Sequence, residues 1–510
     1  MPNQAESGEP SPAGKIKKLR SFLFENTTTR QTIAKNTLWL TVSQFGGRLI
    51  KAVLIIYAAR VLGAAGYGLF SYAVTLAGFL GLLMDPGINA VLMRDSAKSD
   101  EHNRLVIFST TLWIKISLLV IGALIVIFIA PSFSTLPGAK VLLPIVAFIL
   151  VFDTTREFFL ALLRGIEKMQ WDAGIFIFTN LAIVIFGFLS LALHPTPRAL
   201  GWGYALGTGL GALFAMIVMW KYLRDAFSLF SARLVSPILR AAWPFAVTNA
   251  LGLLLTNMDI LIISWMRSAS DVGIYSAAIR IIQVLYLVPG ILQLSTLPLI
   301  SRLANHDNAK LRITLERTIS ILFLVAIPMT IGGVILGTGI MSLIFGPEFT
   351  PGSLAFKILM VTMLVDFPGA IIGNAIFAYG HQKSLIITTA IAGVSNVVFD
   401  LLLIPHFGMT GSAVATLIAQ TLSNLYLWRV MQKLNYFKIF PYLKKVTAAS
   451  LVMSIAAAVL LFLHVEVVLN IAICTVIYFG LLKAFREPLL DEILAIIPGG
   501  WRLMEKTQDA

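Results

Sequence analysis

Residues 318–345 read TISILFLVAIPMTIGGVILGTGIMSLIF, a stretch of 28 residues without a charged side chain. A helix needs about 20 apolar residues to cross the hydrocarbon core of a bilayer. This stretch alone therefore predicts a membrane span. Similar stretches recur along all 510 residues, of which 58% are hydrophobic and 13% are charged. That composition excludes a soluble globular protein.

The apolar stretches predict an all-α integral membrane protein with about 14 transmembrane helices. The spans are expected near residues 36–60, 68–92, 105–130, 140–163, 172–193, 199–221, 241–266, 273–299, 318–345, 352–378, 384–404, 410–431, 446–463 and 467–483. No short apolar region with a small-residue cleavage site precedes the first span, so we expect no removable signal peptide.

The distribution of Lys and Arg predicts the orientation. Most of the 39 basic residues lie in segments that are inside if both termini are cytoplasmic, and the outer loops then hold only Arg60, Lys140, Arg198 and Arg267. This bias agrees with the positive-inside rule and predicts a multi-pass protein of the cytoplasmic (inner) membrane. The net charge of +14 is then explained by anionic membrane lipids, and we expect no nucleic-acid partner.

Internal similarity predicts two parallel six-helix bundles followed by two C-terminal helices. Residues 68–73 (GLFSYA) resemble residues 273–278 (GIYSAA), and both segments open an even-numbered span. Small residues also recur in spans six and twelve at an offset of 208, at Gly203, Gly207, Gly211 and at Gly411, Ala415, Ala419. Because six spans are an even number, both bundles enter from the same side. Such glycine stripes also simply let helices pack closely.

The predicted domains follow from this repeat. They are a disordered basic cytoplasmic tail (1–35), an N-terminal bundle (36–221), a cytoplasmic linker (222–240), a C-terminal bundle (241–431), two extra transmembrane helices (446–483) and a second cytoplasmic tail (484–510). The expected substrate path runs between the two bundles.

Motifs for soluble enzyme chemistry are absent from the sequence. There is no phosphate-binding GxxxxGK[ST] loop, HExxH helix or GxSxG elbow. The six histidines are scattered over loops and span ends, and Cys474 is the single cysteine. We therefore expect no metal, no cofactor and no enzymatic activity, although a membrane glycan polymerase or ligase remains an alternative. The short outer loops argue against that alternative.

Two cations lie deep in the first span. Arg48 is 13 residues beyond Lys35, about 20 Å along a helix, which is too deep for easy snorkelling. Lys51 follows on the same face. Charged groups at this depth need a partner or a wet cavity. The pair predicts a cavity that receives an anion or, alternatively, a structural ion pair with an acid of a neighbouring span.

Span four carries a cluster of three charges, Asp153, Arg156 and Glu157. Their spacing favours a local ion pair between Arg156 and Asp153. The alternative is that one of the two carboxylates takes up a coupling ion, a proton in particular. The other acids at membrane depth include Asp259, Asp366 and Asp400, for which we expect pairing or capping roles.

Prolines next to glycines are predicted to interrupt three spans. They occur at Asp85-Pro86-Gly87, Val288-Pro289-Gly290 and Phe367-Pro368-Gly369. The first two lie in repeat-equivalent spans, two and eight. Pro86, Gly87, Pro289 and Gly290 are therefore candidate hinges for alternating access, and ordinary proline kinks are the alternative.

Several short motifs resemble the polysaccharide transporter family, the O-antigen and capsule lipid-linked oligosaccharide flippases of the multidrug/oligosaccharidyl-lipid/polysaccharide exporter superfamily. The similar segments are residues 33–37 (IAKNT), 63–70 (GAAGYGLF), the Asp85-Pro86-Gly87 break with Arg94 beyond it, 346–349 (GPEF) and 380–381 (GH). Span count and repeat extend the resemblance over nearly the whole chain.

This resemblance implies a flippase for polysaccharide biosynthesis that carries a polyprenyl-diphosphate oligosaccharide through a cationic central cavity. Arg48 and Lys51 would supply that cavity, with Arg280 as a further contributor. Moving two negative charges outward gains about 4.6 kcal/mol per 100 mV of membrane potential, and a proton or sodium ion is the expected coupling partner. The alternative within the superfamily is a cation-coupled multidrug exporter, which would favour a carboxylate-rich cavity.

Overall fold

The computed structural model describes residues 29–227 and 229–490, and nearly all of their regular structure is α-helical. In the first half the helices are α2 (Thr29–Gly81), α3 (Ile88–Lys98), α4 (Glu101–Leu124), α5 (Ala130–Phe133), α6 (Pro137–Lys140), α7 (Leu143–Gly165), α8 (Met169–Leu193), α9 (Pro197–Val218) and α10 (Trp220–Ala226). A short π-helix, η1 (Ile125–Ile129), joins α4 to α5. Most of the predicted N-terminal tail, residues 1–28, lies outside the described residues, as do residues 491–510 of the predicted C-terminal tail.

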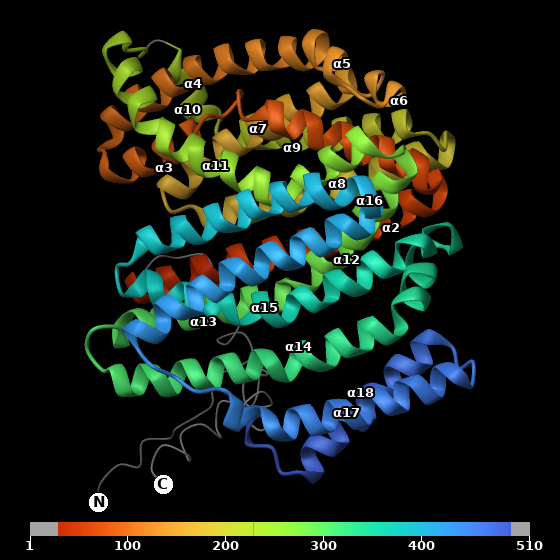
Figure 1. The fold of residues 1–510 in the computed structure, drawn as a ribbon. Helices are drawn as coiled ribbons and strands as arrows, with labels where there is room; N and C mark the ends of the chain where they lie inside the picture. Colours follow the sequence, from red (N-terminus) through yellow and green to blue (C-terminus); the bar gives the residue numbers. More distant parts are fainter. Residues whose placement is uncertain (1–28, 228, 491–510) are drawn as a thin grey trace, which may run out of the picture.

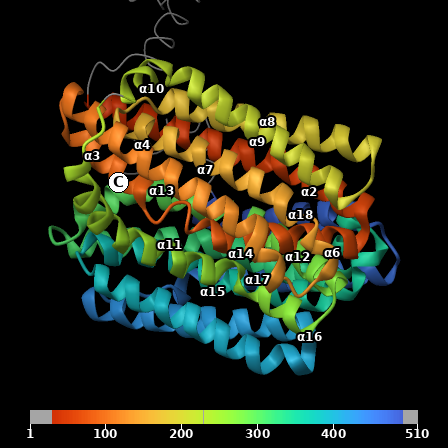
Figure 2. The same ribbon diagram turned by 90° about the horizontal axis from the view of Figure 1, so that it is seen from above.

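The second half contains the remaining helices. They are α11 (Ala232–Met266), α12 (Ala269–Leu285), α13 (Leu287–Leu303), α14 (Asn308–Phe345), the 3-10 helix η2 (Pro347–Gly352), α15 (Ser353–Ala378), α16 (Gln382–Leu434), α17 (Phe440–Phe462) and α18 (Val467–Ala484). The long helices run along roughly one common direction (Figures 1 and 2). α17 and α18 pack on each other and on α14, at the edge of the molecule (Figure 1).

These helices confirm the all-α membrane fold. By length and composition, ten helices of the described chain could cross a membrane, or eleven if the bent α11 is one span. Two of the ten cover two predicted spans each, because α2 bends at Gly63 (φ 66°) and α16 bends at Gly408 (φ 57°). The fourth predicted span coincides with α7, whose internal charges keep it out of the ten. The number fourteen stays a prediction.

Of the three predicted helix interruptions, only the first is a full break. The chain leaves helical geometry between Gly81 and Ile88, where Gly87 has a φ of 88° that favours glycine. The second is only a slight irregularity at Tyr286, between α12 and α13 and three residues before Pro289, where φ and ψ stay in the helical region and residues Ala269–Leu303 form one candidate span. The prediction for Pro368 was wrong, because α15 continues through it. Its neighbours are buried, and packed helices can satisfy the one backbone group that a proline frees.

α2 connects the two halves of the molecule. It packs against α8 in the first half and against α12 in the second. Within the first half, α8 and α9 approach closely because a Cβ at Gly203 or Gly207 would press on the backbone of α8. The glycine stripe of span six therefore serves helix packing, the simpler of its two readings.

Candidate functional site

Lys51 lies between helices of both halves, and Arg48 lies one turn before it on α2. The Lys51 ammonium is 5.2 Å from the centre of the Tyr204 ring on α9, a cation–π geometry. Arg48 is exposed and Lys51 is half-buried. Neither has a carboxylate oxygen within 4.0 Å in the described part of the chain. The structural ion pair that the sequence left open is therefore not formed.

Arg280 of α12, in the opposite half, lies within electrostatic range of Lys51. It is close enough to interact electrostatically with both Lys51 and Tyr204. One terminal nitrogen of Arg280 donates to Gln283 Oε1 at 2.8 Å, but its buried Nε has no hydrogen-bond partner in the part of the chain that the structure describes. Burying two cations at membrane depth without a carboxylate ligand costs free energy unless an anion or water binds them. Lys51 and Arg280 thus lie within electrostatic range of each other, and the binding role of all three predicted residues stays a prediction.

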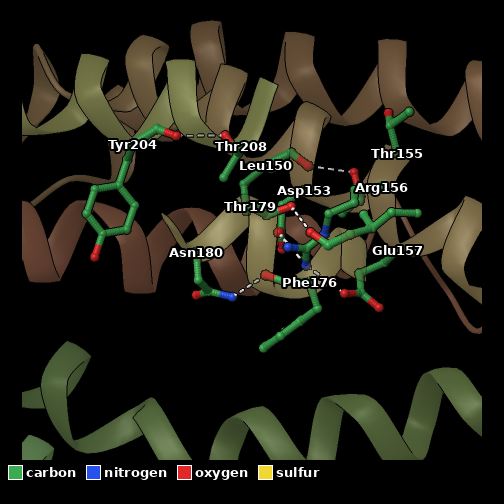
Figure 3. Close-up of polar contacts among 12 residues, drawn as sticks. Leu150, Asp153, Thr155, Arg156, Glu157, Phe176, Thr179, Asn180, Tyr204 and Thr208 are labelled. Carbon is green, nitrogen blue, oxygen red and sulfur yellow. Dashed lines mark hydrogen bonds and ion pairs between the residues drawn. The ribbon is translucent and has the colours of Figure 1, made fainter. Parts of the chain in front are cut away.

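The charges of α7 form a chain of ion pairs. The Arg156 guanidinium donates to Glu157 at 2.6 Å and lies 2.9 Å from Asp153, as Figure 3 shows. Arg164 continues the chain from Glu157, at 3.4 Å, to Asp172, at 2.9 and 3.1 Å. The predicted pair of Arg156 with Asp153 is confirmed. Both carboxylates proposed for ion coupling, Asp153 and Glu157, have an arginine partner in this structure.

The acids of the second half have neutral partners instead. Tyr275 donates to Asp259 at 2.6 Å. Tyr286 donates to Asp366, which also accepts from the Asn424 amide at 2.9 Å. Asp259 and Asp366 are thus paired as expected, but no sequence pattern indicated that tyrosines would be the donors.

Asp400 differs from the other two acids. It is fully buried, and neither of its carboxylate oxygens has a hydrogen-bond partner within the described residues. It interacts electrostatically with Asp259. Since an unpartnered carboxylate at this depth is expensive, the expected pairing or capping role is not seen for Asp400.

An open cavity of about 410 Å³ lies between the two halves near the break in span two. α2 and α7 form one wall and α11 forms the other. We call it the Asp85 cavity, and its lining residues are Gly78, Gly81, Leu82, Asp85, Leu150, Thr154, Thr248, Asn249, Gly252 and Leu253. The Asp85 carboxylate lies 3.6 Å from the ammonium of Lys115, which is almost fully buried, and accepts from the Asn89 N–H at 3.3 Å. The one acid of the cavity is therefore neutralised.

Just after the bend of α2 at Gly63, the two halves are in direct contact. A Cβ on Gly68 would overlap the carbonyl oxygen of Ala269, and a Cβ on Gly273 would overlap that of Ala64. Gly68 and Gly273 occupy equivalent positions in the sequence repeat. Backbones can approach this closely only where both helices lack side chains.

Polar contacts reinforce this crossing. The Glu348 carboxylate of η2 accepts from the Ala64 N–H at 3.1 Å, beside the left-handed Gly63. Arg60 donates to the carbonyl oxygens of Ile344, at 2.7 Å, and Leu343 at the end of α14. The halves are thus closed at this end. We call this contact the seam and define it by Arg60, Ala64, Gly68, Gly273 and Glu348.

Known proteins with similar sequences are named as flippases or transporters. The chain is 25% identical to "Probable flippase AglR" of Haloferax volcanii over 76% of this chain and 82% of the relative. It is 21% identical to "Putative O-antigen transporter" of Shigella flexneri over 78% of this chain and 97% of the relative.

Solved structures share the fold. "Lipid II flippase MurJ, inward closed conformation" has a TM-score of 0.72 at 18% identity and covers 89% of this chain and 99% of its own. A multidrug resistance MATE family transporter of the MOP superfamily in its inward-facing conformation has a TM-score of 0.59 at 16% identity, over 82% of this chain and 98% of its own.

Two family models match the sequence. The MatE model matches residues 244–402. The model described as "Polysaccharide biosynthesis protein" matches residues 33–304, which is more than half of the chain. On that match, this chain belongs to the polysaccharide biosynthesis protein family.

Proposed function

We propose that this protein is a flippase that moves a polyprenyl-diphosphate-linked oligosaccharide across the cytoplasmic membrane for polysaccharide biosynthesis. The observation that carries the proposal is the electrostatic proximity of Lys51 and Arg280 from opposite halves, with no carboxylate ligand on either and no partner for the Arg280 Nε among the described residues. A diphosphate would supply the missing acceptors. Charge-assisted hydrogen bonds of this kind are about twice as strong as neutral ones.

The names of the relatives support this substrate class. AglR is called a probable flippase and the Shigella protein an O-antigen transporter. Such names describe carriers, and in keeping with them we propose a transport cycle without a catalytic step. The acids of α7 do not oppose the proposal, since two arginines balance most of their charge.

We propose an alternating-access cycle, which the closed seam and the Asp85 cavity support. With both termini cytoplasmic, the seam lies on the outer side and the cavity lies towards the inside. Release of the substrate outward then requires the seam to part. We propose that the break at Pro86 and Gly87 and the irregularity before Pro289 and Gly290 absorb this motion, since both adjoin helices that form the seam.

The energy source is a further part of the proposal. The membrane potential favours outward movement of two negative charges by about 4.6 kcal/mol per 100 mV. A proton or sodium ion would complete the cycle, with Asp153 and Glu157 as the sequence-based candidates. Asp153→Asn and Glu157→Gln should then abolish the dependence of transport on pH or sodium, whereas an unchanged dependence would assign these acids to packing alone.

Transport in proteoliposomes tests the flippase. The probe is a fluorescent polyprenyl diphosphate that bears a neutral hexose oligosaccharide, and the rate is measured for wild type, Lys51→Ala and Arg280→Ala. We expect each variant to lose about tenfold or more, because a charged hydrogen bond is worth about 1.5–3 kcal/mol. Lys51→Arg should retain most of the rate. Arg198→Ala, which removes an exposed cation of a predicted outer loop, is the matched control.

The same vesicles test the rival function. The MatE match to residues 244–402 and the acids of the second half are the features that favour export of organic cations. If wild type moves an organic cation but not the lipid probe, and Lys51→Ala and Arg280→Ala behave like wild type, the flippase proposal is wrong. A purified protein that elongates or transfers the glycan would instead indicate a polymerase or ligase.

A further inference from the structure

The Asp85 cavity has the size of a small-molecule site. Its volume of about 410 Å³ falls within the 300–1,000 Å³ that is usual for ligand pockets. The first half of the chain supplies one wall and the second half the other. A ligand held there therefore contacts both halves at once.

The polar groups of this cavity are effectively neutral. Among the described residues that line it there is no lysine or arginine, and Asp85 is balanced by Lys115 behind it. The Asn249 amide makes no hydrogen bond within the described chain and offers both donors and an acceptor. The hydroxyls of Thr154 and Thr248 donate to their own helices, at 2.6 and 2.9 Å, so their lone pairs stay free.

Two glycines of the cavity wall have no packing reason to be glycine. A Cβ added to Gly78 or Gly252 would meet no atom of the described residues within 4 Å. Glycine inside a helix lowers stability relative to alanine, so these positions give up stability without gaining a close helix contact. What they provide is open space inside the cavity. Gly81 is similar, since its Cβ would only touch the Leu150 side chain at 3.5 Å.

We propose that the Asp85 cavity is a subsite for neutral, hydroxyl-bearing sugar units of the transported head group. This inference rests on the proposed flippase function and separates the tasks within one path: Lys51 and Arg280 hold the diphosphate, and the Asp85 cavity holds sugar units. Sugar hydroxyls match the free amide and hydroxyl lone pairs described above. A cationic ligand would lack a free carboxylate, and an acyl chain would leave the Asn249 amide unsatisfied.

A sugar bound in the Asp85 cavity would connect substrate recognition to the relative motion of the two halves. Because α11 and the α2–α7 wall belong to different halves, rocking of the halves changes the shape of the cavity. A sugar bound there is released when the walls separate. The subsite thus selects on the glycan, whereas the cations select on the diphosphate that all such carriers share.

Filling the cavity tests the subsite. Gly252→Leu and Gly78→Leu place a side chain in open space, and Asn249→Ala removes the free amide. Two probes are compared in proteoliposomes: a polyprenyl diphosphate with a neutral hexose oligosaccharide and the same lipid with a single hexose. We expect each leucine variant to slow the oligosaccharide probe about tenfold more than the single-hexose probe, and Asn249→Ala to do so by about threefold, the loss of one neutral hydrogen bond.

The controls distinguish failure of the sugar subsite from failure of the proposed flippase function. Gly480→Leu adds the same side chain to an exposed glycine of α18 that also has nothing within 4 Å, and it should leave both rates unchanged. If wild type moves neither probe, the flippase proposal fails. Suppose instead that wild type moves both probes and that Lys51→Ala abolishes both movements. If the cavity variants then slow neither probe, or slow both equally, the flippase function stands and the sugar subsite is overturned. Thermal unfolding of each purified variant excludes misfolding as the cause.

Discussion

The seam and the Asp85 cavity use the same residue type for opposite purposes. Gly68 and Gly78 lie ten residues apart on α2. A side chain on Gly68 would collide with the backbone of the other half, whereas a side chain on Gly78 would meet nothing. Glycine brings the halves together at one end of their interface and keeps them apart further along it. The interface between the two halves therefore changes from backbone contact at the seam to open space at the Asp85 cavity.

The largest expected effect comes from enlarging the glycines of the seam. Gly68→Leu or Gly273→Leu forces the halves apart, because the new side chain must displace backbone. An overpacking penalty of about 1–3 kcal/mol shifts the ratio of closed to open seam by about 5- to 150-fold. The measurement is maleimide labelling of Ala64→Cys in a Cys474→Ser background, together with flipping of the lipid probe. Labelling should rise and flipping should fall, and unchanged labelling in both variants would contradict a glycine contact.

A smaller effect is expected from removing the charge balance of the cavity. Lys115→Met leaves the Asp85 carboxylate without its cation. Because Asp85 is partly exposed, the free energy of unfolding should drop by only about 1 kcal/mol, the low end for an unsatisfied buried group. Adding Asp85→Asn should restore most of that loss in a double-mutant cycle of thermal unfolding. A loss in the double variant equal to the sum of the two single losses would mean that the pair contributes no coupling energy.

The Glu348 contact should have a weaker effect on the seam. Glu348→Ala removes the acceptor for the Ala64 N–H, and a hydrogen bond of this kind contributes about 0.5–1.5 kcal/mol. Labelling of Ala64→Cys, a buried residue of the seam, should increase a few-fold. Glu348→Gln keeps an acceptor oxygen and should lie between wild type and Glu348→Ala. If Glu348→Gln behaves like Glu348→Ala, the effect of Glu348 is due to its charge.

Local sequence patterns account for the fold because membrane insertion imposes local rules. A span needs about 20 apolar residues, so stretches such as 318–345 predict the helices directly. The depth of Lys51 follows from counting residues along one helix. The wrong prediction for Pro368 shows the limit of such rules, because the response of a helix to proline depends on neighbouring helices that the sequence does not place.

The candidate site depends on contacts between distant segments, and here the sequence was less informative. Lys51 lies over the Tyr204 ring and within electrostatic range of Arg280 because α2 packs against both α9 and α12. The resemblance to a known family suggested Arg280, whereas nothing in the residues suggested Tyr204. The arginine partner of Asp153 is local, at i+3, and was predictable. The tyrosine that donates to Asp366 comes from 80 positions away.

The smallest expected effect is the most specific test of the comparison between the two regions. Gly78→Ala and Gly252→Ala add one methyl group in open space and remove the flexibility of a helical glycine. The free energy of unfolding should rise by about 0.4–1 kcal/mol, and the flipping rate should stay near that of wild type because a methyl group fills little of the cavity. Gly68→Ala on the same helix should destabilise the closed seam, since even a Cβ overlaps Ala269. If all three alanine variants behaved alike in thermal unfolding and in Ala64→Cys labelling, the two regions would not differ in the way that their geometry implies.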